Sequence, residues 1–424
     1  MLDVLWGLGG MAALLLAAVA ISTDRRAIRP RTVAAALGLQ VLFGVLVLYV
    51  PPGRAALDAA TRAVQAVIDS SKEGIAFLFG SLVPEDGVVF ALQVLPVIVF
   101  FAALTSVLYH WKVLQRVVRV LGSGLHVLLG TSRAESVNAA TNVFLGQTEA
   151  PLVIRPYLPR ISTSSLFAVM TGGLATVAGS VLVGYALLGA ELDQLIAAAF
   201  MAAPGALLMA KIVVPESQEV DADGVPVRVA TGGGGVADGE DAPEEAPEPE
   251  EEEHVNVIDA AADGAAQGLK LAANIGAMLL AFISLIALVN LLLGAVGGWF
   301  GQPDLTFERL LGWLFAPVMF VVGVPWDEAV RAGSFVGQKT VVNEFVAFSN
   351  FGPVADEFSA KTKAIVTFAL TGFANLGSLA ILLGGLGGMA PNRRSEIATY
   401  GVRSIAAATL ANLMSAAIAG MLLA

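Results

Sequence analysis

The chain has 424 residues, of which 56% are hydrophobic and 14% are charged, whereas roughly a quarter of the residues in soluble domains are charged. It has no cysteine, and its three histidines lie far apart in sequence, which excludes disulfides, thiol nucleophiles and a histidine metal cluster. The composition predicts an integral membrane protein that lies in a lipid bilayer, and no nucleic acid partner is expected.

Eight apolar segments are long enough to cross the hydrocarbon core as helices, which takes about 20 residues. The first has no basic residues before its apolar run, so it is interpreted as a retained span and not as a cleaved signal. Between the second and the third, "RAALDAATRAVQAVIDSSKEG" is amphipathic and predicts a helix in the membrane interface. The predicted spans are 2–22, 32–50, 88–111, 165–188, 194–214, 272–298, 361–387 and 400–423.

Arginines in two short loops predict how these spans are oriented, because basic loops stay on the cytoplasmic side. The loop "STDRRAIRPR" follows the first span, and "APNRRSE" precedes the last one. With eight crossings, both loops are cytoplasmic only if both termini lie on the outer side. We expect this arrangement in a bacterial inner (plasma) membrane.

Most of the net charge of −11 belongs to residues 215–254, which hold fourteen acids and one base. The rest of the chain has a net charge of +2. Because this acidic segment is rich in Glu, Pro and Gly and has no apolar periodicity, it predicts a disordered cytoplasmic connector. An acidic segment can also bind a cation or a partner.

Two further regions, 113–157 and 304–350, are apolar but are interrupted by charges, glycines and prolines, and they resemble each other. "FLGQ" in the first corresponds to "FVGQ" in the second, and "TGGLATVAGSVL" downstream of the first corresponds to "TGFANLGSLAIL" downstream of the second. The aligned pairs are 129–149 with 322–340, and 171–182 with 371–382.

The predicted orientation makes this repeat inverted, since one copy begins on the cytoplasmic side and the other outside. Broken segments at corresponding positions in two halves indicate a transporter site near the bilayer midplane. We therefore expect two opposed re-entrant hairpins, at about 129–157 (the first hairpin) and 326–351 (the second hairpin). The chain then divides into 1–87, 88–214 with the first hairpin, 215–254, and 255–424 with the second hairpin.

Four acids lie within the apolar body, where a charge costs at least about 2.5–3.5 kcal/mol on insertion scales and is a functional candidate by default. Glu135 and Glu328, at matching positions of the repeat, can instead pair with Arg133 and Arg331 or cap helices. The four are Glu135, Glu149, Glu328 and Glu344.

The polar residues near the predicted breaks suit an uncharged solute that forms hydrogen bonds. Gln147 offers an acceptor and a donor pair to the amide-like edge of a nucleobase. Glu344 with Asn375 and Ser378 can bind vicinal hydroxyls, and a carboxylate binds them more strongly than a neutral group does. Phe373 can pack on a base or a sugar, or it can be an ordinary core aromatic. Gln147 can also simply bind the backbone freed at the break.

The motifs "GQTEAPL", "LFAVMTGGLATVAG", "KTVVNEFVAF" and "TGFANLGSLAILLGGLG" together closely resemble the concentrative nucleoside transporters, over nearly the whole chain outside the acidic segment. The resemblance implies a sodium-coupled nucleoside symporter and not an enzyme. It implies an all-α integral membrane protein with eight transmembrane helices, one interfacial helix and two opposed re-entrant hairpins. Members of this family are homotrimers and are thought to work as elevators.

The resemblance also implies binding residues for the nucleoside. Those for the base are Gln147, Thr148 and Glu149, with Val181 nearby; those for the ribose are Glu344, Asn375 and Ser378, with Phe373 lining the pocket.

The family's sodium site corresponds to the side chains of Asn142 and Thr176 and the carbonyls of Leu145 and Val177. Sodium is a hard cation that prefers oxygen, and unwound backbone supplies carbonyl oxygens without burying a charge. Relatives can carry Ser where this chain has Thr176, and the hydroxyl oxygen is retained.

Three alternatives stay open. The first is a proton-coupled nucleoside symporter in which Glu149 or Glu344 carries the proton. The second is an ion channel or a membrane scaffold whose buried acids are structural. An intramembrane enzyme is the least favoured, because the sequence has no cysteine, no metal cluster and no convincing Ser-His pair.

Overall fold

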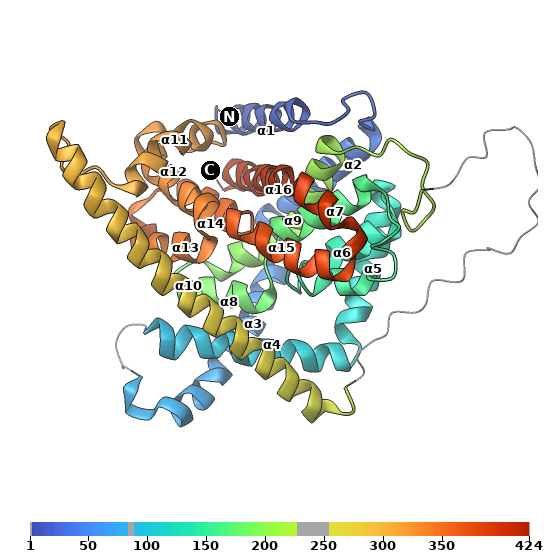
Figure 1. Ribbon diagram of the computed structural model, residues 1–424, viewed down its shortest axis with the longest axis horizontal. Helices are drawn as coiled ribbons and strands as arrows, with labels where there is room; N and C mark the ends of the chain where they lie inside the picture. The colour runs from blue at the N-terminus through green and yellow to red at the C-terminus, as the bar shows by residue number, and fades with distance from the viewer. Residues whose placement is uncertain (1, 84–88, 227–253, 424) are drawn as a thin grey trace, which may run out of the picture.

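The computed structural model describes residues 2–83, 89–226 and 254–423, and its named elements are all helices. Helix α10 (Val257–Trp299) runs diagonally along one side of the molecule in Figure 1 and packs against α4 (Leu95–His110). Most of the other helices gather on one side of α10. The predicted all-helical class is confirmed for the described residues.

Seven helical segments of the described chain are long and apolar enough to cross a membrane, and each corresponds to a predicted span. The eighth prediction, 361–387, is instead two short helices separated by a break. The seven are α1 (Leu2–Ala20), α2 (Pro30–Gly44) continued by η1 (Val45–Tyr49), η3 (Phe90–Val94) with α4, α7 (Thr163–Ala175) with α8 (Gly179–Leu187), α9 (Leu192–Val213), α10 and α16 (Arg394–Leu422).

Both spans that carry the aligned Thr-Gly sequence are broken near their middle. The first leaves the helical conformation at Thr176, whose φ of −104° and ψ of 175° are extended. The second consists of α14 (Ala360–Leu370) and α15 (Leu376–Met389), and the extended Asn375 caps α15. The breaks expose backbone groups that need partners inside the protein.

The two predicted hairpins turn where the sequence places its polar runs. In the first hairpin, α6 (Arg133–Thr141) gives way to a non-helical turn at 142–149 and then to the 3-10 helix η4 (Ala150–Ile154). In the second hairpin, α12 (Trp326–Val341) turns at 342–343 into α13 (Glu344–Phe351). The preceding helices are α5 (Val113–Leu129), which packs on α6, and α11 (Phe307–Val321), which meets α12 at a bend of 116°.

Burial separates an inner group of helices from an outer one. In α9, 89% of the span is buried, and in the α7–α8 pair 83% is buried. In α10 the corresponding share is 6%, so its apolar side chains face outward. The first broken span and α9 therefore lie at the centre of the fold.

The predicted interfacial helix is α3 (Pro51–Phe79), longer at both ends than the amphipathic stretch that predicts it. Most of its side chains are exposed, and its position at the membrane surface stays a prediction. Three short 3-10 helices complete the described fold: η2 (Gly80–Leu82), η5 (Gly352–Glu357) and η6 (Pro391–Arg393).

The first part of the acidic segment differs from the disorder expected there. Residues 215–226, which we call the strap, form a hydrogen-bonded turn in which the Asp221 amide donates to the Val225 carbonyl over 2.9 Å. The strap carbonyls of Ala222 and Gly224 accept from the amides of Arg133 and Ser162, over 2.7 and 2.9 Å. The strap thus joins the start of α6 to the start of α7. The rest of the predicted connector, 227–253, lies outside the described residues.

Candidate functional site

The two broken spans meet at their breaks. The amide of Phe373 donates to the carbonyl of Thr176 over 3.2 Å, which joins the break after α14 to the break after α7. Phe373 is half-buried, and its own carbonyl accepts from the amide of Asn375 over 2.8 Å. Thr176 of the predicted sodium site and Phe373 of the predicted ribose site are therefore neighbours in space, although about 200 residues separate them in sequence.

The Glu344 carboxylate lies at the centre of the predicted ribose site and joins three helices. It is 4% exposed and is the first residue of α13, whose amide groups favour negative charge at that end. One of its oxygens accepts from the Tyr185 hydroxyl over 3.1 Å, and the other accepts from the Asn375 side-chain amide over 2.9 Å. The Asn375 oxygen in turn accepts from the amide of Ser378 over 2.8 Å, which fixes the start of α15.

Tyr185 is a site residue that the sequence analysis missed. It is fully buried in α8, with its ring stacked on Phe348 at 4.4 Å between ring centroids. A tyrosine in an apolar span is an ordinary feature, so its type gave no signal. Its spacing could have given one, because it lies four residues after Val181 and therefore on the same face of α8.

The predicted base-binding run, 147–149, lies in the turn of the first hairpin. Gln147 is 6% exposed, and a Cβ added at Gly173 of α7 would lie 2.9 Å from its Cβ. Its side-chain oxygen is buried without a hydrogen-bond partner among the described residues. Thr148 lies against Gly385 of α15, where an added Cβ would be 3.1 Å from its methyl carbon.

Glu149 differs from its two neighbours because its carboxylate turns back into its own loop. One oxygen accepts from the Gly146 amide over 2.5 Å. In this structure it binds the backbone freed at the turn, the role considered above for Gln147. Helix α15 links the base and ribose sets, since Asn375 at its start contacts Glu344 and Gly385 lies against Thr148.

The chemistry of the predicted sodium donors fits a hard cation. The Asn142 side-chain nitrogen donates to the carbonyl and the side-chain oxygen of Asn138, over 3.0 and 2.9 Å. Its own oxygen is therefore oriented away from Asn138, and it is buried with no partner among the described residues. The Thr176 hydroxyl donates to the Gly172 carbonyl over 2.8 Å, which leaves its oxygen lone pairs available. Leu145 and Val177 lie in non-helical backbone beside them.

Glu135 and Glu328 cap helices, one of the two roles considered for them. Glu135 and Ser132 form a capping box at the start of α6, and the carboxylate pairs with Lys211 of α9 at 2.7 Å and not with Arg133. Glu328 accepts from the amide and the hydroxyl of Ser359, the N-cap residue of α14, over 2.9 and 2.8 Å.

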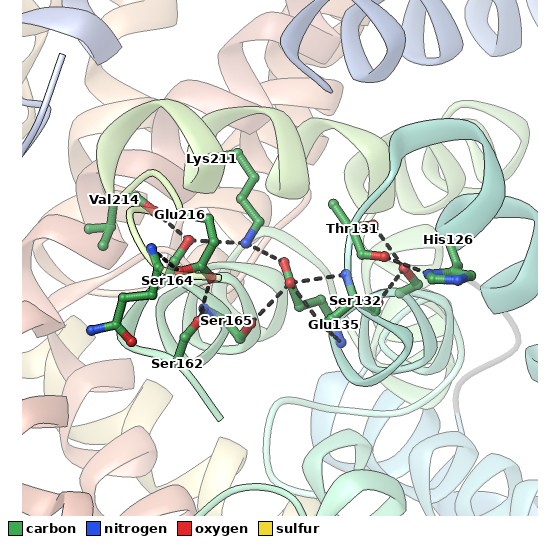
Figure 2. A network of polar contacts seen from close by, with 12 residues as sticks. His126, Thr131, Ser132, Glu135, Ser162, Ser164, Ser165, Lys211, Val214 and Glu216 are labelled. Carbon is green, nitrogen blue, oxygen red and sulfur yellow. Dashed lines mark hydrogen bonds and ion pairs between the residues drawn. The ribbon is translucent and has the colours of Figure 1, made fainter. Parts of the chain in front are cut away.

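Figure 2 shows the Glu135 contacts in a wider polar network at the base of the first hairpin. Lys211 lies between Glu135 and Ser164, and its ammonium donates to the Ser164 hydroxyl over 3.0 Å. Ser162 connects the same region to Glu216 of the strap. A cavity of about 210 Å³ lies beside this network, lined by Ser164 and Glu216 and by none of the predicted binding residues.

Comparisons with known proteins agree along the whole length of the chain. Residues 9–82, 91–192 and 194–420 match the family models of the Na⁺ dependent nucleoside transporter N-terminus, nucleoside recognition, and the Na⁺ dependent nucleoside transporter C-terminus. An uncharacterized transporter of Bacillus subtilis, YutK, is 50% identical, over 99% of this chain and 100% of its own. The nucleoside permease NupC of Helicobacter pylori is 44% identical, over 98% of this chain and 97% of its own.

The solved structures of CNTnw have the same fold. CNTnw in an inward-facing substrate-bound state matches with a TM-score of 0.90 at 51% identity, over 99% of this chain and 98% of its own. A doubly substituted CNTnw in an outward-facing state matches with a TM-score of 0.90 at 50% identity, over 100% and 98%. The chain therefore belongs to the concentrative nucleoside transporter family and is a multi-pass membrane protein of Na⁺-dependent nucleoside transport.

Proposed function

We propose that the chain imports nucleosides and holds the ribose at the Glu344 carboxylate. The observation that carries this proposal is the position of Glu344, buried between the Tyr185 hydroxyl and the Asn375 amide. An ionised acceptor fixed by two donors has further lone pairs for vicinal hydroxyls. Ser378 and Phe373, next to Asn375 in the broken span, complete the ribose site.

The nucleobase binds at the turn of the first hairpin. The free side-chain oxygen of Gln147 accepts from a ring or exocyclic N–H, and its amide nitrogen donates to a ring carbonyl. Thr148 and Glu149 complete the polar edge, and Val181 supplies an apolar surface. The proposed substrate is a neutral, uridine-like nucleoside, because its hydrogen bonds alone can satisfy these side chains and no charge on the substrate is needed.

Sodium binds where Asn142 and Thr176 meet the carbonyls of Leu145 and Val177. The support is the unpartnered, buried Asn142 oxygen, which a cation would satisfy. One sodium that enters with a neutral nucleoside carries one positive charge, so the membrane potential adds about 2.3 kcal/mol per 100 mV to the driving force. The breaks are joined through Thr176 and Phe373, so ion and sugar bind to connected backbone.

The transport cycle moves the hairpins and broken spans as one body past the outer helices, as in an elevator. In support, the inner helices are almost completely buried whereas α10 presents an apolar surface. That surface is the proposed contact of a homotrimer. The protein lies in the inner membrane with both termini outside, as the basic loops predict.

The test is uptake of labelled uridine into proteoliposomes with an imposed inward sodium gradient. We expect accumulation that increases with a negative-inside potential and collapses when sodium is equal on both sides. Accumulation driven by a proton gradient instead would support the proton-coupled alternative. No accumulation under either gradient, from folded protein, would contradict the proposal.

A further inference from the structure

One side-chain amide joins the carboxyl ends of both broken half-helices. The Asn412 nitrogen, from α16, donates to the carbonyl of Ala175 over 2.7 Å and to the carbonyl of Thr371 over 2.9 Å. Ala175 is the last residue of α7, and Thr371 follows the last residue of α14. Asn412 is 2% exposed, and Ala175 and Thr371 are 0% and 1% exposed, so bulk solvent does not reach these carbonyls.

A buried lysine orients this amide. The Lys339 ammonium, from α12, donates to the Asn412 side-chain oxygen and to the Ala369 carbonyl, over 2.8 Å in each case. Lys339 is 1% exposed, and burying an ammonium is costly unless its surroundings carry compensating negative charge. Carboxyl ends of helices supply partial negative charge, and the end of α14 lies at the ammonium. Neither residue is among the proposed binding residues, although the Lys339 ammonium also attracts the Glu344 carboxylate electrostatically.

A glycine permits this arrangement. A Cβ added at Gly372 would lie 2.3 Å from the Asn412 oxygen and 2.8 Å from the Ala175 carbonyl oxygen. The Thr-Gly sequence of the second span thus allows the two breaks to approach each other across the amide of Asn412. The packing requires a residue without a side chain at this point.

We propose that Asn412 and Lys339 are positioning residues that couple sodium binding to nucleoside binding. The carbonyls held by Asn412 are one residue before Thr176 of the proposed sodium site and two residues before Phe373 of the proposed ribose site. When sodium binds and fixes the backbone at one break, the shared amide of Asn412 therefore favours one backbone conformation at the other break. The proposal rests on the assignment of the sodium and ribose residues made above.

The test compares nucleoside affinities in two salts. Purified protein in nanodiscs is titrated with uridine by calorimetry in saturating sodium chloride and in choline chloride of equal ionic strength. The coupling ratio is the Kd in choline divided by the Kd in sodium, and we expect about 5 to 150 for the unmodified protein. For Asn412→Leu we expect the ratio to fall at least about fivefold. Asn412→Asp, which keeps the acceptor for Lys339 but removes both donors, should behave similarly and serves if the leucine variant does not fold.

Matched variants separate coupling from folding and from ion binding. Ser415→Ala, in the same helix, removes a hydroxyl that contacts Gln40 and Ala411, so it should keep the ratio unchanged. Asn142→Ala should require more sodium but retain the full ratio once sodium saturates. Lys339→Met should also lower the ratio. Its sodium titration should still saturate, because Asn142 of the proposed sodium site is unchanged.

The outcomes that overturn the coupling role differ from those that overturn the site assignment. If both Asn412 variants keep the ratio, or weaken uridine binding equally in both salts, their role is only structural. An unmodified protein with equal affinities in the two salts would also overturn the proposal. If Asn142→Ala leaves the sodium titration unchanged, the sodium assignment fails, while a lowered ratio in the Asn412 variants still supports the coupling role.

Discussion

The hydroxyl of Tyr185 lies 3.1 Å from the Glu344 carboxylate. A helix of the first half of the chain therefore orients the carboxylate of the second half that we propose to bind the sugar. Tyr185→Phe keeps the stacked ring and removes only this donor. We expect the KM for uridine to rise about 3- to 10-fold, because the carboxylate loses one of the two donors that orient it, an indirect effect of about 0.6–1.4 kcal/mol on sugar binding. Uptake kinetics measure the change, with Tyr49→Phe at the surface as the control. An unaltered KM would mean that the contact does not orient the carboxylate.

Glu344→Gln keeps the size of the side chain but removes its charge. We expect it to abolish most uptake, with uridine binding weakened roughly 10- to 150-fold, since charge-assisted hydrogen bonds become neutral ones. Direct binding and uptake are measured on the same preparation. Glu357→Gln, an exposed carboxylate that pairs with Arg331, is the matched control. Wild-type affinity in Glu344→Gln would exclude the carboxylate from the ribose site.

Gln147→Ala should abolish most transport while assembly stays intact, because the proposed base contacts are removed. Gly173→Ala leaves residue 147 as Gln but should also reduce transport. The new Cβ would lie 2.9 Å from the Gln147 Cβ and would displace that side chain. Uptake of labelled uridine checks both, and size-exclusion profiles check assembly. Gln65→Ala on the exposed side of α3 should transport normally. Full uptake by Gln147→Ala would discard its assigned role.

The buried pair of Glu135 and Lys211 should contribute to stability and not to binding. Lys211→Met leaves a buried carboxylate without its cation, and we expect a loss of about 3–5 kcal/mol in the free energy of unfolding. Thermal melting of the purified protein measures this loss. Adding Glu135→Gln, which preserves the capping geometry, should restore most of the stability. If the double variant melts no higher than the single one, the unpaired charge is not the cause.

The strap and the rest of the acidic segment should respond differently to change. Deletion of 229–252 should leave uptake within about twofold of normal, because the sequence predicts a connector there and a change in the length of a connector has a small free-energy effect. Gly224→Val should impair uptake, since Gly224 has φ of +87° and an added Cβ would lie 2.8 Å from the Ser132 hydroxyl. Asp223→Val, at the half-buried neighbouring position, is the control. Normal uptake by the Gly224 variant would show that the strap is dispensable.

Sequence patterns predicted the spans because a helix must be long and apolar enough to cross the bilayer, and both properties are visible in the sequence. They also predicted where the two hairpins turn, because Gln147 and Glu344 are polar residues in apolar surroundings. The breaks at Thr176 and Asn375 were not predicted from hydropathy, because the segments around them are apolar enough to form continuous spans. The partners of those residues were harder to predict. Tyr185 is 159 residues away from Glu344, and no local periodicity relates the two.

The same reason explains why Lys339 and Lys211 were overlooked. Each lies near the end of a helix, where a lysine ordinarily extends into water, and only the folded arrangement shows that both are buried. The role of the strap was hidden for a related reason. Its composition matches that of the acidic residues that follow it, whereas its order comes from backbone hydrogen bonds to 133 and 162.

The buried carboxylate of Glu344 also has a consequence for which metabolites can pass. A phosphate on the ribose would place a second negative charge close to it, and two like charges about 5 Å apart repel by roughly 3 kcal/mol at a protein-like dielectric constant. The proposed ribose site would therefore disfavour phosphorylated nucleosides on either side of the membrane. A nucleoside phosphorylated after entry would then bind the proposed site more weakly than the free nucleoside, so phosphorylation inside the cell would help to retain it.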